Sequence, residues 1–592
     1  MSFRSLQRAG ACLLVGGRTR FRLWAPDARK VLVELEINTG SVETHALHPQ
    51  ADGWFSAEVA CAAGSRYRYR VDGQWVPDPA SRAQAAGLQG PSLVVDPAYA
   101  WRTPNWSGRP WTDSVIYELH VGTLGGFKGV EAHLQRLAEL GITAIELMPI
   151  HEFPGTRNWG YDGSLLFAPQ SSYGSPAELK HLIDRAHGLG LQVFLDVVYN
   201  HFGPEGNYLG RYAKAFFRED SHTPWGQAID FRRQQVRDFF IDNALMWLFE
   251  YRFDGLRLDA VHAIAEPYFL VELAAQVRSH TEPGRHLHLI LENEDNAAGL
   301  LSGAYTAQWN DDGHNVLHVL LTGEQHAYYR DFGEAPIQKL ARCLAEGFVY
   351  QGQANRHGKA RGEPSAHLPP SAFVLFLQNH DQIGNRALGE RLIALCDPDA
   401  LRAATVLLLL SPMVPLLFMG EEWGSRRPFL YFTDYQEELA EAVRNGRRNE
   451  FAEFPAFSDP ATRAGIPDPN ALETFTRSIP DFEAMDNPAH RPWLALYKQL
   501  LALRQRELLP RLPGAQALGS QVLGQAALRA RWRLGDDSSL SILLNLGAER
   551  LDGVIRKPAG RLLWESRPDA ALAASKGQLL QQSALVYLEE SS

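Results

Sequence analysis

The chain has 592 residues, of which 45% are hydrophobic and 21% are charged, which predicts a globular protein of several domains rather than one compact core. Its net charge of −10, without any block of Lys and Arg, excludes the electrostatic pattern of a nucleic-acid-binding protein. Its four cysteines are scattered without a CxxC spacing, which argues against a zinc site or a disulfide framework and favours a reducing, cytoplasmic location. The apolar run near the N-terminus is too short for a secretory signal peptide.

The first 100 residues contain short alternating runs such as TRFRLWAP, KVLVELE and SRYRYRVDG, which predict an N-terminal β-sandwich. Residues 101–111, WRTPNWSGRPW, are rich in Trp, Pro and Gly and predict a linker. Over residues 112–505 apolar strand-like runs alternate with helical patterns, and about eight such repeats favour an α/β fold, a closed (β/α)8 TIM barrel with loop insertions. A doubly wound open sheet is the alternative. Residues 510–592 alternate again and predict a C-terminal β-sandwich.

One uncharged run, AATVLLLLSPMVPLLFMG from Ala403, has the length of a membrane span. Pro412 and Pro415 interrupt it, and two glutamates follow it directly. Because proline breaks a helix interior, the run predicts a buried helix, a turn and a buried strand, and no membrane span.

Four of the strand-like runs of the barrel region end in an acidic residue. In a parallel barrel all strand C-termini lie on one face, where the active site of such folds is built, so the four carboxylates are expected to converge there. A single carboxylate at such a place could be a helix N-cap, but four in succession favour a catalytic site. The four residues are Asp196, Asp259, Glu292 and Asp381.

Arg257 lies two residues before Asp259, so on a strand the two side chains point to the same side and the guanidinium can hold Asp259 ionised. One ionised carboxylate beside one that stays protonated is the equipment for cleaving a glycosidic bond. His201 and His380 stand at the same strand ends. No HExxH motif occurs, so we interpret both histidines as hydrogen-bond donors to sugar hydroxyls and predict no metal site.

Four short segments carry a resemblance to a known family. DVVYNH (196–201), GLRLDAVH (255–262), LENED (291–295) and LQNHD (377–381) resemble, in order and spacing, the four short regions of the α-amylase superfamily, glycoside hydrolase family 13. The N-terminal FRLWAPDARKVLVEL and YRYRVDG resemble the glucan-binding-like β-sandwich that precedes the barrel in branching and debranching enzymes. The resemblance implies a retaining glycosidase with no cofactor.

The resemblance also implies roles for individual residues. Asp259 would be the nucleophile, Glu292 the general acid and base, and Asp381 the residue that binds hydroxyls of the distorted sugar. Arg257, His201 and His380 would support these three, and Tyr161 in NWGYDG would stack under the same sugar. In a retaining enzyme the two reacting carboxyl groups lie ~5–5.5 Å apart.

Two positions depart from the family pattern or leave it incomplete. Glu294 is a rival acid two residues beyond Glu292, but Glu292 directly follows the strand LHLIL and is the predicted acid. Asn200 stands where some family members bind calcium, and nothing else in the sequence completes such a site.

The sequence around the fourth region, including QNHDQIGNRALGERL and AQWNDDGHNVLHVLLTGE, resembles the members of this family that release trehalose. This resemblance implies cleavage of the α-1,4 bond next to the terminal trehalose of maltooligosyltrehalose, and functional pairing with a maltooligosyltrehalose synthase. Trp225 and Asp312 are the predicted lining of the trehalose pocket. Two alternatives stay open, a glycogen branching or debranching enzyme and a non-catalytic glucan-binding relative.

Overall fold

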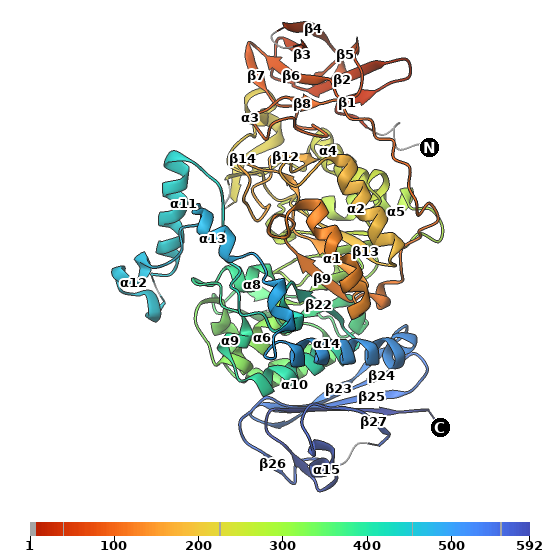
Figure 1. The fold of residues 1–592 in the computed structure, drawn as a ribbon, viewed down its shortest axis with the longest axis vertical. Helices are drawn as coiled ribbons and strands as arrows, with labels where there is room; N and C mark the ends of the chain where they lie inside the picture. Colours follow the sequence, from red (N-terminus) through yellow and green to blue (C-terminus); the bar gives the residue numbers. More distant parts are fainter. Residues whose placement is uncertain (1–6, 39–40, 224–225, 453, 557–558, 592) are drawn as a thin grey trace.

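The computed structural model describes residues 7–591 except 39–40, 224–225, 453 and 557–558 (Figure 1). Its centre is a closed barrel of eight parallel strands, in the order β10-β13-β16-β17-β18-β21-β22-β9. The barrel closes where β22 pairs with β9, with Leu416 opposite Ile116, which excludes the open-sheet alternative. The strands are β9 Ile116–Leu119, β10 Ala144–Leu147, β13 Gln192–Val197, β16 Gly255–Leu258, β17 His288–Leu291, β18 Ala307–Trp309, β21 Phe373–Phe376 and β22 Val414–Phe418.

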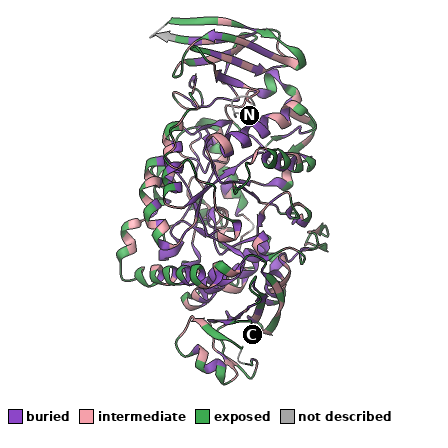
Figure 2. Cartoon of the chain, turned by 90° about the vertical axis from the view of Figure 1, so that its right-hand side faces the viewer, coloured by how far each residue is buried: buried purple, intermediate pink, exposed green. Residues whose placement is uncertain are grey.

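The barrel strands are apolar because they are buried on both sides, with helices packed outside them (Figure 2). The helix α2 begins with a capping box, in which Ser175 and Glu178 satisfy each other's backbone N–H groups. The main helices are α1 Gly126–Leu140, α2 Pro176–Gly188, α4 Gln234–Leu245, α5 Tyr268–His280, α6 Asp311–Thr322, α7 Pro336–Glu346, α10 Pro398–Leu410 and α14 Arg491–Leu503.

The apolar run from Ala403 forms the end of α10, a short turn and β22, all buried, so the prediction for this run is confirmed. Within the described part of the chain, no helix is both long and apolar enough to cross a membrane.

The N-terminal strands form an eight-stranded antiparallel sheet in the order β1-β2-β5-β4-β3-β6-β7, with β8 paired to β6. Phe21 of β2 packs against Tyr67 of β6 with ring centroids 5.0 Å apart, although three strands separate β2 from β6 in the sheet. The sheet therefore folds over one core as a sandwich. Its strands are β1 Gly10–Leu13, β2 Arg18–Trp24, β3 Val31–Asn38, β4 Ser41–Pro49, β5 Trp54–Ala60, β6 Arg66–Val71, β7 Gln74–Val76 and β8 Ser92–Leu93.

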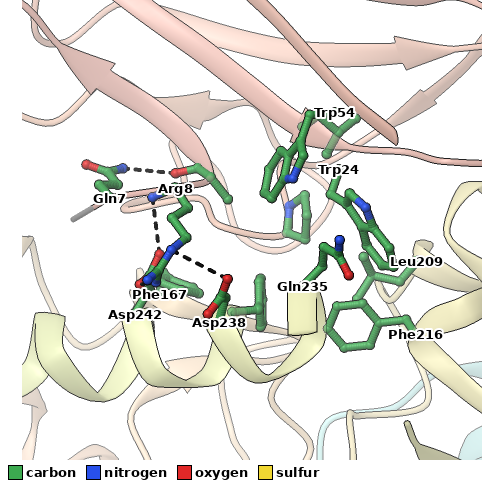
Figure 3. A pocket seen from close by; sticks show the side chains of 14 residues that line it. Gln7, Arg8, Trp24, Trp54, Phe167, Leu209, Phe216, Gln235, Asp238 and Asp242 are labelled. Carbon is green, nitrogen blue, oxygen red and sulfur yellow. Dashed lines mark hydrogen bonds and ion pairs between the residues drawn. The ribbon is translucent and has the colours of Figure 1, made fainter. Parts of the chain in front are cut away.

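The N-terminal sandwich is attached to the barrel along α4. Arg8 forms ion pairs with Asp238, at 3.5 Å, and with Asp242, and the Trp24 ring lies 6.3 Å from that of Phe216 (Figure 3). A small, mainly apolar cleft, partly open to solvent, lies at this seam. Its lining does not include the strand-end carboxylates.

The segment that joins the sandwich to the barrel is held by buried carboxylates beneath the strands. Asp184 of α2 accepts hydrogen bonds from the backbone N–H groups of Arg102, at 2.8 Å, and Thr103, at 3.0 Å. Asp254, just before β16, accepts one from the Trp106 indole at 2.8 Å. The predicted linker is thus fixed to the amino-terminal end of the barrel.

The C-terminal strands form a five-stranded antiparallel sheet in the order β23-β24-β25-β29-β27. One face joins the main core, where α10 packs on it, and the other is covered by the β26–β28 ribbon and α15 Ala570–Ser575. The second layer of this sandwich is therefore a ribbon and a helix. The strands are β23 Gln516–Gly524, β24 Ala527–Arg533, β25 Ser539–Asn545, β26 Leu551–Asp552, β27 Arg561–Glu565, β28 Gln578–Leu579 and β29 Ser583–Glu589.

Several excursions leave the carboxyl-terminal ends of the barrel strands. They include the hairpins β11 His151–Glu152 with β12 Leu165–Pro169, β14 Phe217–Thr223 with β15 Gly226–Ile229, and β19 Gln353–Ala354 with β20 Ala360–Arg361. Farther along the chain, the helices α11 Glu437–Glu450, α12 Pro460–Ala464 and α13 Leu472–Arg477 project from one side of the barrel (Figure 1).

Candidate active site

The four predicted carboxylates follow or end strands of the barrel. Asp196 is the next-to-last residue of β13, and Asp259 and Glu292 come directly after β16 and β17. Asp381 lies in the first turn of α8 His380–Gly384, which follows β21. Because the strands are parallel, all four stand at the same end of the barrel, as predicted.

Arg257 joins two of these carboxylates inside the barrel. Its Nη1 donates to both carboxylate oxygens of Asp196, at 2.9 and 2.8 Å, and to Oδ1 of Asp259 at 2.8 Å. The guanidinium is buried and lies 4.2 Å from the centre of the Trp309 ring. Asn200 donates to Oδ2 of Asp259 at 2.8 Å, so both oxygens of Asp259 are oriented.

Glu292 is held on the other side of Asp259. Its Oε2 accepts a hydrogen bond from the Ala260 N–H at 2.6 Å and lies 3.5 Å from Nη2 of Arg257. Ala260 directs that N–H from a left-handed backbone conformation, with φ of 41°, which is unusual for a residue other than glycine. Glu292 therefore has a fixed position at the price of local backbone strain.

Electrostatics favour the protonated form of Glu292. Burial raises its pKa, the negative charges of Asp259 and Asp381 raise it further, and Arg257 opposes them. The rival Glu294 has a side chain that is 72% exposed and lies 3.8 Å from His262. Of the two acids, only Glu292 is both largely enclosed beside Asp259 and biased towards holding a proton.

His380 is fixed by a carboxylate of β9, and Asp381 by an amide four residues along its own segment. The backbone N–H of His380 donates to Oε2 of Glu118 at 3.0 Å, and its ring bonds the other oxygen of the same carboxylate. Burial disfavours a charged ring, but the Glu118 carboxylate outweighs it and raises the pKa of His380. Asp381 accepts a hydrogen bond from Asn385 Nδ2 at 2.6 Å and remains partly exposed.

Tyr161 and His201 contact each other and adjoin this group. The Tyr161 hydroxyl donates to Asp196 at 2.6 Å, and its ring stacks on His380 with centroids 5.1 Å apart and planes at 22°. His201 contacts the Tyr161 carbonyl oxygen through Nε2 at 3.0 Å and Asn200 through Nδ1. The structure thus brings the predicted aromatic and histidine side chains to one site with the carboxylates.

The two residues predicted to line the trehalose pocket have different outcomes. Asp312 is fully buried, accepts hydrogen bonds from the N–H groups of Val349 and Tyr350, and pairs with Arg361 at 3.0 Å. It anchors a loop inside the fold, so its prediction as a pocket residue is wrong. Trp225 lies outside the described residues.

The sequence reasoning missed two carboxyl groups inside the barrel. Glu118 of β9 and Glu146 of β10 are opposite each other in the sheet, and both are buried. Within the described chain Glu146 has no hydrogen-bond partner, and burial, with the charges of Glu118 and Asp196, raises its pKa well above the ordinary value. An acid within an apolar run, as in VIYEL and TAIEL, was the available signal.

A metal site is not supported by the side chains described. Asn200, at the position compared with a calcium ligand, donates to both the carboxylate and the backbone carbonyl oxygen of Asp259 instead. His314 and His318 lie four residues apart on α6, but His318 bonds Glu324 at 2.7 Å. Among the described residues, no group of three His, Cys, Asp or Glu side chains is arranged to hold a metal ion.

A parallel barrel with Asp259, Glu292 and Asp381 at its rim defines a glycoside hydrolase of the α-amylase class. Family models agree: residues 105–241 match the α-amylase catalytic domain, residues 8–100 carbohydrate-binding module 48 (isoamylase N-terminal domain), and residues 515–587 a domain of unknown function, DUF3459. The chain belongs to the malto-oligosyltrehalose trehalohydrolase family. The relative of that name from Deinococcus radiodurans is 40% identical over 556 residues, covering 90% of each chain.

Two further comparisons bear on the fold and on the alternatives. A crystal structure of a Salmonella typhimurium protein superposes with a TM-score of 0.91 and 43% identity, covering 98% of this chain and 99% of that one. The 1,4-alpha-glucan branching enzyme of Cutibacterium acnes is 32% identical, but the match covers only 41% of each chain.

Proposed function

We propose that this protein hydrolyses the α-1,4-glucosidic bond next to the terminal trehalose of maltooligosyltrehalose and releases trehalose. The observation that carries the proposal is the Arg257-centred cluster in a chain that is similar, over 90% of its length, to a trehalohydrolase. The branching enzyme similarity covers less than half of the chain, which gives the alternative less support.

The proposed reaction is a double displacement with retention of configuration. Asp259 attacks the anomeric carbon, while Glu292 gives its proton to the glycosidic oxygen and the C–O bond to the leaving sugar breaks. Glu292, now a carboxylate, takes a proton from water, whose oxygen then displaces Asp259 from the sugar. Arg257 and Asn200 keep an oxygen of Asp259 aimed at the carbon through contacts of 2.8 Å each.

The remaining site residues have binding roles in this proposal. Asp381 binds hydroxyls of the distorted sugar, and His380 and His201 donate hydrogen bonds to it. Tyr161, whose ring already stacks on His380, supports the same sugar from below. These contacts strengthen as the ring flattens, which lowers the barrier rather than only tightening substrate binding.

The wider proposal concerns the chain as a whole. Residues 1–100, 112–505 and 510–592 act as separate domains around the linker 101–111, with carbohydrate contacts on the first two. A cytoplasmic location is supported by four cysteines that are all free thiols. The substrate is made by a maltooligosyltrehalose synthase, with which the protein is functionally paired.

The test compares two substrates. The purified protein is incubated separately with maltotriosyltrehalose and with maltopentaose, and the products are separated by chromatography. Trehalose released from the first, with the second nearly untouched, is the expected result. Equal cleavage of both, or new branch points on amylose, would move the protein to another activity of the same superfamily. Unchanged turnover in Asp259→Asn would instead revive the non-catalytic alternative.

A further inference from the structure

A fifth carboxyl group, that of Asp311, belongs to the same rim. Asp311 is the first residue of α6 and follows β18 after a single residue. In the barrel β18 lies between β17 and β21, the strands that lead to Glu292 and Asp381. The topology therefore puts Asp311 between the predicted acid and the predicted sugar-binding carboxylate.

Asp311 differs from its neighbour Asp312 in what its side chain contacts. The Asp312 carboxylate is fully buried and satisfied by backbone N–H groups and Arg361. Asp311 is partly exposed, and within the described residues its carboxyl group has no hydrogen bond or ion pair. Its carboxyl group is open at the rim, where a sugar hydroxyl can become its hydrogen-bond partner.

The charges around Asp311 agree with this position. Burial raises its pKa well above the ordinary value, Glu292 adds more to the shift than Asp381 does, and Arg361 opposes them. Arg361 itself is fixed, since its Nε donates to the Glu294 carbonyl oxygen at 2.7 Å and its guanidinium pairs with Asp312. Asp311 thus lies within the electrostatic reach of both Glu292 and Arg361 at this part of the rim.

We propose that Asp311 binds a hydroxyl of the leaving-group sugar, beside the oxygen that Glu292 protonates. The inference rests on the proposed function, because it takes Glu292 as the acid that faces the leaving group. Tyr161 and His380, which stack together, serve the sugar on the other side of the scissile bond. Asp311 would then help to select a sugar of the right shape after the cleavage point, without touching the sugar that reacts.

The experiment compares two leaving groups in Asp311→Ala and Asp311→Asn. Maltotriosyltrehalose leaves a disaccharide, whereas α-maltotriosyl fluoride leaves only fluoride, which departs with the electron pair of the C–F bond as Asp259 attacks. For Asp311→Ala, kcat/KM on maltotriosyltrehalose should fall about tenfold to a hundredfold, the value of a lost hydrogen bond to a buried group. On the fluoride it should change less than about threefold, and Asp311→Asn, which still forms hydrogen bonds, should lose less.

A matched control is Asp295→Ala, an exposed acid in the loop after Glu292 that should leave both rates unchanged. Equal losses of Asp311→Ala on the two substrates, or no loss on either, would overturn the proposal, and melting temperatures identify a variant that is merely unfolded. If wild-type protein cleaves the fluoride but releases no trehalose, the proposed function has failed instead. Asp311 is then tested with the α-1,4-glucan that the wild type does cleave.

Discussion

Asp254 fastens three segments of the chain beneath the barrel, so we expect Asp254→Asn to destabilise the fold without altering the active site. The side chain is fully buried and accepts hydrogen bonds from the Trp106 indole and Arg285, both at 2.8 Å. It also accepts from the Val193 N–H at 2.9 Å and lies 2.9 Å from Nε2 of His187. The contact set lies at the opposite end of β16 from Asp259.

The size of the effect follows from the pKa of Asp254. Burial alone would raise it, but His187, Arg285 and the Val193 N–H lower it from 3.8 to about 2. Since each unit of pKa shift corresponds to ~1.36 kcal/mol, the lowered pKa of Asp254 contributes about 2.5 kcal/mol to the free energy of unfolding. Because the folded-state pKa is the lower one, the contribution is complete above about pH 5 and is lost as the pH falls towards 2. The amide introduced by Asp254→Asn would also place its NH2 group against side chains that are themselves hydrogen-bond donors. The total loss in the free energy of unfolding at pH 7 should therefore be about 3–5 kcal/mol.

The assay is urea unfolding followed by tryptophan fluorescence at pH 7, 5 and 3. The gap in unfolding free energy between wild type and Asp254→Asn should narrow by about 1 kcal/mol from pH 7 to pH 3. Asp537→Asn, a surface acid that is 74% exposed, is the control and should stay within about 0.5 kcal/mol of wild type throughout. A gap that does not change with pH would refute the electrostatic reasoning, and no gap would refute the importance of the contacts.

Three further predictions concern catalysis. Asp381→Asn should lower trehalose release at least about a hundredfold while shifting the melting temperature by less than about 2 °C; comparable losses of both would count against a binding role. The raised pKa of Glu292 means that activity should fall as the pH rises through that pKa, because the acid loses its proton; this limb of the kcat/KM profile should vanish in Glu292→Gln and persist in Glu294→Gln. Arg257→Lys keeps the charge but cannot bridge two carboxylates, so kcat should fall about tenfold to a hundredfold with KM little changed, and a purely raised KM would contradict this reasoning.

Much of this architecture could be predicted from the sequence, because a strand that is buried on both faces is a short apolar run. The polar residue that follows the run marks the carboxyl-terminal end of the strand. That is why Asp259, Glu292 and Asp381 were found at one end of the barrel. The choice of Asp312 over Asp311 failed for a geometric reason: consecutive helical residues point about 100° apart, and composition does not reveal which one faces the rim.

Other parts of the site depend on contacts between distant segments. Glu118 meets His380 across the seam where the barrel closes, a pairing that no local pattern encodes. Asn200 was compared with a calcium ligand, yet its amide orients Asp259. In both cases the side chain's function is set by its three-dimensional neighbours, and residue type and spacing alone left it open.

The pairing of β22 with β9 also bears on how the chain is made. Roughly 300 residues separate the two strands, which at typical synthesis rates is about 15–60 s on the ribosome. Through that time both edges of a growing apolar sheet remain unpaired and open to association with other chains. The N-terminal sandwich, whose eight strands pair only with one another, can fold before the barrel is complete. The last barrel strand thus ends the period of greatest aggregation risk in the biogenesis of this protein.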